Sequence, residues 1–87
     1  MKIKKGFVLM KVGIQNIVVA VDEMAEAFNG MIRLNETGEF LFRKLEEGSE
    51  EQELTDALAQ ECGISPEEAQ QGVAEFLAKL TEAGVIE

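Results

Sequence analysis

Hydrophobic residues divide this chain into a strand-like first third and a helical remainder. Two runs, FVLMKV at residues 7–12 and IVVAV at residues 17–21, are rich in β-branched and large apolar residues, with turn formers at residues 13–16 between them. This pattern predicts a β-hairpin. A polar connector with room for one helical turn, residues 22–26, leads to a third apolar run that predicts a last strand over Asn29 to Leu34.

Side chains of the predicted third strand alternate between the two faces of the sheet. We expect every second residue to face the core, namely Gly30, Ile32 and Leu34. The opposite face then carries Asn29, Met31 and Arg33.

Asn35 follows this strand directly and predicts the start of a first helix, because its side-chain oxygen can accept a hydrogen bond from a backbone N–H of the first turn. Gly48 is suited to end this helix in a left-handed conformation. The predicted buried face consists of Thr37, Phe40, Leu41 and Leu45.

Two further helices are predicted from their start and stop signals. Ser49-Glu50-Glu51-Gln52 matches a capping box, and Gly63 ends that second helix. The strongest local signal is Ser65-Pro66-Glu67-Glu68, which combines a serine cap with proline at the first helical position. Gly84 closes the third helix, after which Val85-Ile86 either tucks back or continues as a tail. The predicted buried residues are Leu54, Ala57, Leu58 and Cys62 in the second helix, and Ala69, Val73, Phe76, Leu77 and Leu80 in the third.

Three strands followed by three helices are typical of an α+β domain. At 87 residues we expect a single domain over residues 1–87. Apolar runs are too short to cross a bilayer, and the amino terminus lacks the apolar core of a signal peptide, so we expect a cytoplasmic protein without membrane contact.

The net charge of −9 is unevenly distributed. Residues 1–34 carry five basic and three acidic side chains, a net charge of +2, which leaves −11 for the helical remainder. Binding to nucleic acid needs basic residues at the phosphates. We therefore expect the helical part to repel nucleic acid.

Few residues offer catalytic or metal-binding chemistry. The chain has no histidine and one cysteine, so we expect no zinc or heme site, no other cofactor and no catalytic residue. The glutamates of residues 46–53 could bind a metal or act as acids and bases, but their isolation from any histidine or nucleophile favours a solvated face. Cys62 falls at a helical core position, which predicts a buried and inert thiol.

The second and third predicted helices could form a helix-turn-helix, joined by Cys62-Gly63-Ile64-Ser65. In a transcription regulator the third helix would enter the major groove of DNA. This helix carries Glu67, Glu68 and Glu75, and no basic residue before Lys79. The charge therefore favours a structural role for the motif, with DNA binding as the alternative.

The open edge of the last strand is the candidate functional surface. Unpaired N–H and C=O groups of an edge strand can accept a further strand, and peptides are recognised in this way. If the third helix lies alongside this strand, the two elements form an apolar groove for the guest. Two alternatives remain: the apolar residues only fill the core, or the edge pairs with a second copy of the chain. The expected groove residues are Met31, Val73, Phe76, Leu77 and Leu80.

Three motifs follow one another along nearly all of the chain. They are Leu34-Asn35-Glu36-Thr37-Gly38 after a strand, Gly48-Ser49 before a helix with Leu54 and Leu58, and a closing pattern of Val73, Phe76-Leu77, Leu80 and Gly84-Val85-Ile86. In this order and spacing they resemble the PqqD family, whose members act in pyrroloquinoline quinone biosynthesis and, more generally, as peptide-recognition domains for ribosomally made, modified peptides.

This resemblance implies a three-stranded antiparallel sheet on a winged-helix-like bundle of three helices, without catalysis of its own. It also implies that the chain binds the leader segment of a precursor peptide and presents it to a modifying enzyme, often a radical S-adenosylmethionine protein. We expect a monomer, with Arg33 and Lys79 as candidates to contact an acidic leader residue. The peptide-binding residues would be Asn29, Gly30, Met31, Ile32, Arg33, Leu34, Val73, Phe76, Leu77, Lys79 and Leu80.

Overall fold

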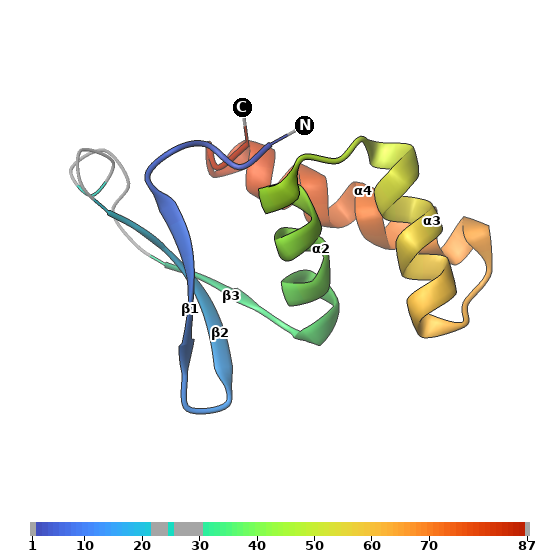
Figure 1. Ribbon diagram of the computed structural model, residues 1–87, viewed down its shortest axis with the longest axis horizontal. Helices are drawn as coiled ribbons and strands as arrows, with labels where there is room; N and C mark the ends of the chain where they lie inside the picture. The colour runs from blue at the N-terminus through green and yellow to red at the C-terminus, as the bar shows by residue number, and fades with distance from the viewer. Residues whose placement is uncertain (1, 22–24, 26–30, 87) are drawn as a thin grey trace.

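The computed structural model describes residues 2–21, 25 and 31–86. Within these residues, three strands come first and three helices follow (Figure 1), which confirms the predicted α+β fold. Of the helices in the described ranges, none combines the length and hydropathy that a bilayer span requires. The strands are β1 (Phe7–Val12), β2 (Gln15–Ala20) and β3 (Met31–Leu34), and the helices are α2 (Glu36–Glu47), α3 (Glu51–Cys62) and α4 (Pro66–Glu82).

The strands form one antiparallel sheet in the order β1-β2-β3. Val12 pairs with Gln15, so the hairpin loop contains only Gly13 and Ile14. Gly13 has a φ of 63°, which tight two-residue hairpin turns require and glycine adopts at little cost. The predicted turn was therefore two residues too long, because Gln15 and Asn16 already belong to β2.

The core lies between one face of the sheet and the helices. Ile32 and Leu34 of β3 are each 8% exposed, whereas Met31 and Arg33 are exposed, which confirms the predicted alternation for these four residues. All five residues predicted for the buried face of the last helix are buried, and they are Ala69, Val73, Phe76, Leu77 and Leu80.

The buried face of α2 was only partly predicted. Leu41 and Leu45 are buried as expected, but Phe42 is also completely buried, and Thr37 is exposed. The buried stripe is centred on Leu41 and Phe42 because α2 contacts both β3 and α3. Phe40 lies at the rim of this stripe, where it is half-buried below the Lys44 ammonium, 5.6 Å from the ring centre.

Helix caps follow the sequence signals with two corrections. Asn35 Oδ1 accepts from the Gly38 N–H at 2.8 Å, as predicted. The capping box of α3 is shifted by one residue, since Glu50 is the N-cap and its N–H donates to Glu53 Oε1. Ser49 instead donates its hydroxyl to the Lys44 carbonyl at 3.0 Å. Gly48 has a positive φ of 91°, but its ψ of 109° lies outside the predicted left-handed helical region.

The last helix begins as predicted, with Ser65 Oγ accepting from the Glu68 N–H at 3.2 Å. After it, Val85 tucks back into the core. Its carbonyl accepts from the Lys4 N–H at 2.7 Å, and Ile86 forms a bridge with Ile3. This pairing explains why the two ends of the chain lie close together in Figure 1.

Cys62 was predicted to be buried and is exposed. It continues the spacing of Leu54 and Leu58, but it is the last residue of α3, and it lines a surface pocket with Glu36, Thr37 and Phe40 at the start of α2. The glutamates at both ends of the α2–α3 connection are exposed, as the prediction of a solvated face requires. Among the described residues, no group of three or more His, Cys, Asp or Glu side chains could hold a metal ion.

Candidate functional site

The register of the hairpin fixes the direction of the backbone groups of the sheet. In an antiparallel pair, hydrogen-bonded residue pairs alternate with pairs that exchange no bond. The Val21 N–H donates to the Gly6 carbonyl at 2.7 Å, and this pair continues the register of β1 and β2. The odd-numbered residues of β2 therefore direct their N–H and C=O groups toward β1, and the even-numbered residues direct theirs toward β3.

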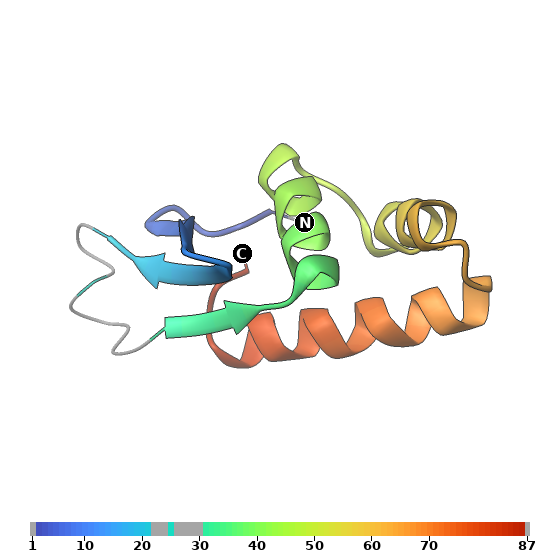
Figure 2. The ribbon, with the colours of Figure 1, turned by 90° about the horizontal axis from the view of Figure 1, so that it is seen from below.

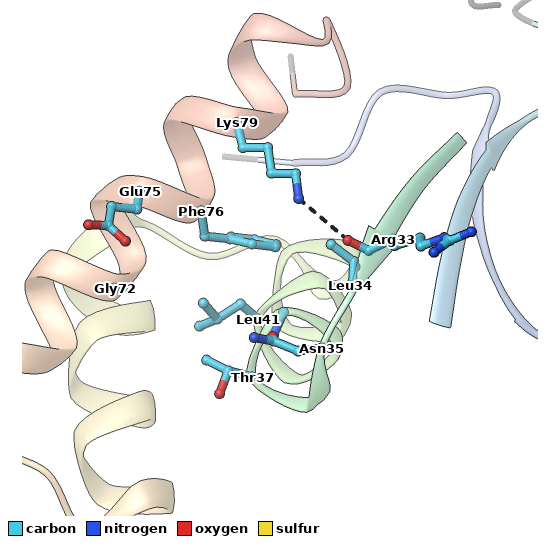
Figure 3. Close-up of a pocket in the computed structure, with 10 residues that line it drawn as sticks. Arg33, Leu34, Asn35, Thr37, Leu41, Gly72, Glu75, Phe76 and Lys79 are labelled. Atoms are coloured by element: carbon cyan, nitrogen blue, oxygen red, sulfur yellow. Dashed lines mark hydrogen bonds between the residues drawn. The ribbon is translucent and has the colours of Figure 1, made fainter. Parts of the chain in front are cut away.

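The same alternation decides which groups of β3 are available to a guest. Val18, an even-numbered residue of β2, pairs with Ile32. Ile32 and Leu34 thus turn their backbone groups toward β2, while Met31 and Arg33 turn theirs toward the open edge. The Arg33 carbonyl confirms this direction, because it accepts a hydrogen bond from Lys79 Nζ of α4 at 3.5 Å (Figure 3).

Helix α4 faces this open edge. Figure 2 shows its C-terminal half running alongside β3, with the start of α2 closing one end of the space between them. A pocket of about 480 Å³ lies there. Its lining residues come from β3, from the start of α2 and from one side of α4, and they are Arg33, Leu34, Asn35, Thr37, Gly38, Leu41, Gly72, Glu75, Phe76 and Lys79.

The pocket, which we call the β3–α4 groove, has apolar walls and a charged rim. In Figure 3 the Phe76 ring points from α4 toward Leu34, and Leu41 lies beside them. The charged lining residues are Arg33, Glu75 and Lys79, and Figure 3 shows the Arg33 guanidinium directed away from α4. The groove thus offers apolar contact inside and the Lys79 ammonium at its rim, in a chain whose net charge is −9.

Four of the predicted site residues meet in the β3–α4 groove, namely Arg33, Leu34, Phe76 and Lys79. Met31 is 60% exposed on the outer face of the sheet, beside the edge. Four others are in the core, with Val73 and Leu80 completely buried and Ile32 and Leu77 nearly so. Asn29 and Gly30 lie outside the described residues, as do most of residues 22–26.

Sequence reasoning missed the contribution of α2 and the polar side of α4. Gly72 and Glu75 are spaced with Phe76 and Lys79 at helical intervals, so this second stripe of α4 was visible in the sequence. Gly38 lies close to the strand, since a Cβ atom added there would be 3.1 Å from the Leu34 Cβ. This close approach brings the α2 start into the groove.

A charge cluster on the other side of α2 joins the hairpin to the helices. Lys11 Nζ of β1 lies 3.6 Å and Arg43 Nη2 lies 3.1 Å from Glu39 Oε2 of α2. The hydrogen bond from Arg43 is the main cause that lowers the pKa of the Glu39 carboxyl, and the charges of Lys11 and Arg43 act in the same direction against desolvation. The lowered pKa keeps the Glu39 carboxylate ionised at neutral pH.

The helix-turn-helix has no basic surface where DNA would bind. The first turn of α4 carries Glu67 and Glu68, both exposed, and Lys79 in its last turn is the one basic residue of this helix. Lys79 is directed toward the Arg33 carbonyl, which places its charge at the groove. The geometry gives the DNA-binding alternative no support.

Comparisons with known proteins identify the chain's relatives. The family model for Coenzyme PQQ synthesis protein D (PqqD) matches residues 8–86. Among solved structures, TbiB1 in complex with the TbiA(beta) leader peptide is similar with a TM-score of 0.82 and 21% identity, covering 100% of this chain and 95% of that chain. Lasso peptide synthetase B1 complexed with the leader peptide has a TM-score of 0.78 and 14% identity, covering 97% and 93%. A search of curated proteins finds no significant match.

Proposed function

This chain belongs to the PqqD family, and from that premise we propose that it binds the leader segment of a ribosomal precursor peptide and presents it to a modifying enzyme. The leader adds to the open edge of β3 as a further strand. Both structural relatives are complexes with leader peptides, which supports this proposal.

One observation carries the proposal: Met31 and Arg33 turn their backbone groups to the open edge of β3, and Arg33 lines the β3–α4 groove beside that edge. Strand addition needs such unpaired groups for main-chain hydrogen bonds, and it needs adjacent pockets for alternate side chains. Leu34, Leu41 and Phe76 supply the apolar part of that pocket. Main-chain pairing sets the register of the guest, and the groove selects among sequences.

The chain's own part in the reaction is binding, without catalysis. The residues that line the groove include no histidine and no cysteine, and its charged lining residues are Arg33, Glu75 and Lys79. Chemistry on the tethered peptide would come from the partner enzyme, for which we propose a radical S-adenosylmethionine protein. We also propose that Asn29 and Gly30 contact the leader.

A titration monitored by NMR tests this function. Leader segments from short reading frames next to the gene would be synthesised and added to the 15N-labelled chain. We expect the amide signals of Met31 to Leu34 and of the groove side of α4 to shift, and those of α3 to stay unchanged. Unchanged β3 signals at saturating peptide would refute strand addition.

Two further measurements separate the alternatives. Sedimentation without peptide should give a monomer, whereas a stable dimer held by β3 would mean that the edge pairs with a second copy. Salt-sensitive binding to duplex DNA would instead support the regulator alternative.

A further inference from the structure

Lys79 makes an unusual contact with the edge of the sheet. Its ammonium reaches from α4 to the Arg33 carbonyl, 46 residues away in the sequence, at 3.5 Å. Within residues 2–21, 25 and 31–86 this is the one side-chain hydrogen bond made to the backbone of β3. Lysine at a sheet edge is a common device against unwanted strand pairing. Lys79 therefore occupies one of the four outward backbone groups of Met31 and Arg33, the Arg33 carbonyl.

A guest strand competes with Lys79 for this position. A strand paired to β3 lies about 4.8 Å from it and donates an N–H to an outward carbonyl. It would fill the same gap that the Lys79 side chain now crosses from α4 (Figure 3). The present contact is long and exposed, so its loss costs little. Strand addition would release the ammonium into the rim of the groove.

The released ammonium then needs a partner. Glu75 is four residues earlier on α4, the spacing at which helical ion pairs form, yet no ion pair joins these two described residues. Lys79 is the one basic residue of α4. Figure 3 shows the Arg33 guanidinium directed away from α4, so Lys79 is the cation that faces the gap. A cation facing this gap favours a carboxylate on the guest.

The register defines where that carboxylate would lie. The guest residue directly opposite Arg33 has its side chain on the same face of the sheet as the Arg33 side chain. Opposite charges at such a cross-strand pair attract each other. Repulsion from the distant acidic helices is screened beyond about 10 Å at 0.1 M salt, so the local cations decide the preference.

We infer that Lys79 is a specificity-determining residue that exchanges the Arg33 carbonyl for a carboxylate of the guest. The preferred guest is a strand with aspartate or glutamate opposite Arg33 and apolar residues on either side. This inference rests on the proposed strand addition at β3. It adds that the groove sets the register of the guest by charge, and that Lys79 protects the edge from other strands.

Selection from a random dodecapeptide display library tests the inference on the 87-residue chain. Wild type, Lys79→Met and Lys79→Arg would each be used as bait, and Lys5→Met serves as the control because it removes the same charge from another exposed residue. Methionine and arginine are good helix formers, so both variants should fold. Selected peptides would be checked by NMR for signal shifts at Met31 and Arg33.

We expect wild type, Lys79→Arg and Lys5→Met to enrich an acidic residue at one fixed distance from the apolar positions, and Lys79→Met to lose this preference. A selected acidic peptide should bind Lys79→Met about two- to fivefold more weakly, the range of one exposed ion pair, and its amide analogue should bind both alike.

Two results would overturn the inference in different ways. Peptides that shift β3 signals but show no acidic preference, or the same preference with Lys79→Met, would refute the role of Lys79 and leave strand addition intact. If no selected peptide shifts the β3 signals, the proposed function fails and the inference fails with it.

Discussion

Proline substitution in β3 distinguishes the N–H groups that face a guest strand from the N–H groups that bond to β2. The Met31 N–H points to the open edge, and its side chain is already 60% exposed. Met31→Pro therefore removes no hydrogen bond to β2, and we expect the free energy of unfolding to change by less than about 1 kcal/mol. A guest strand loses one main-chain donor and meets the proline ring instead.

The effect on binding follows from the bond that is lost. A hydrogen bond contributes about 0.5–1.5 kcal/mol, and a guest carbonyl left buried without a donor costs about 1–3 kcal/mol more. Binding should weaken at least about tenfold, since about 1.4 kcal/mol corresponds to a factor of ten. Met31→Ala is the matched control, because it shortens the side chain and keeps the N–H.

Ile32→Pro, in contrast to Met31→Pro, should strongly lower the free energy of unfolding. Its N–H is directed to β2, and the side chain is 8% exposed. The lost bond, the unpaired carbonyl on β2 and the lost packing together predict destabilisation of about 3–6 kcal/mol. Thermal unfolding followed by circular dichroism would show a fall of more than about 12 °C in the melting temperature.

Calorimetric titration with a bound leader peptide completes the comparison. The expected order of affinity is wild type, then Met31→Ala, then Met31→Pro, with all three chains folded. If Met31→Pro binds as well as Met31→Ala, strand addition at β3 is wrong. If Met31→Pro unfolds as easily as Ile32→Pro, the assignment of inward and outward groups is wrong.

Three stability measurements test other parts of the structure. Gly38→Ala would place a Cβ 3.1 Å from the Leu34 Cβ and should destabilise the fold by about 1 kcal/mol. Gly72→Ala meets only an ordinary contact at 3.7 Å and should stabilise the fold by about 0.5–1 kcal/mol. Urea unfolding measures both changes, and equal effects of the two variants would contradict this prediction. Asn16 has a buried Oδ1 without a hydrogen-bond partner in the described residues. Asn16→Leu should therefore leave the free energy of unfolding unchanged or raise it by about 1 kcal/mol in the same assay. A clear loss of stability would show that Oδ1 accepts a hydrogen bond. The pKa of Glu39 in the folded chain lies below its ordinary value of 4.5, so its ion pairs stabilise the fold above that pH, and this stabilisation disappears as the pH falls through the folded pKa. Glu39→Gln should remove this pH dependence of the free energy of unfolding. If wild type and Glu39→Gln show the same dependence on pH, the role of the cluster is refuted.

Local signals predicted most of the fold. Ser65-Pro66 fixed the start of α4, Asn35 fixed the start of α2, and alternation in β3 gave its buried and exposed faces. Each of these depends on residues within one turn or one strand. The hairpin loop was misjudged because Gln15 and Asn16 are turn formers by type, and pairing with β1 overrides that preference.

The groove was harder to predict than the fold, because it depends on distances between elements. Periodicity placed Val73, Leu77 and Phe76 on one face of α4, but it could not show that Val73 is sealed in the core while Phe76 reaches the pocket. The exposure of Cys62 likewise depends on how the end of α3 packs against its neighbours, which helical periodicity does not contain. The hydrogen bond from Lys79 to Arg33 joins residues 46 apart, a relation that no local pattern contains.

Amide hydrogen exchange of β3 tests the central claim most directly. Ile32 and Leu34 direct their N–H groups to β2, so their amides should already be protected without a guest and change little. Met31 and Arg33 direct theirs to the open edge, so their amides should become protected when a leader peptide binds. Protection that appears at Met31 and Arg33 alone would agree with strand addition. Bound peptide with no new protection at either amide would contradict it.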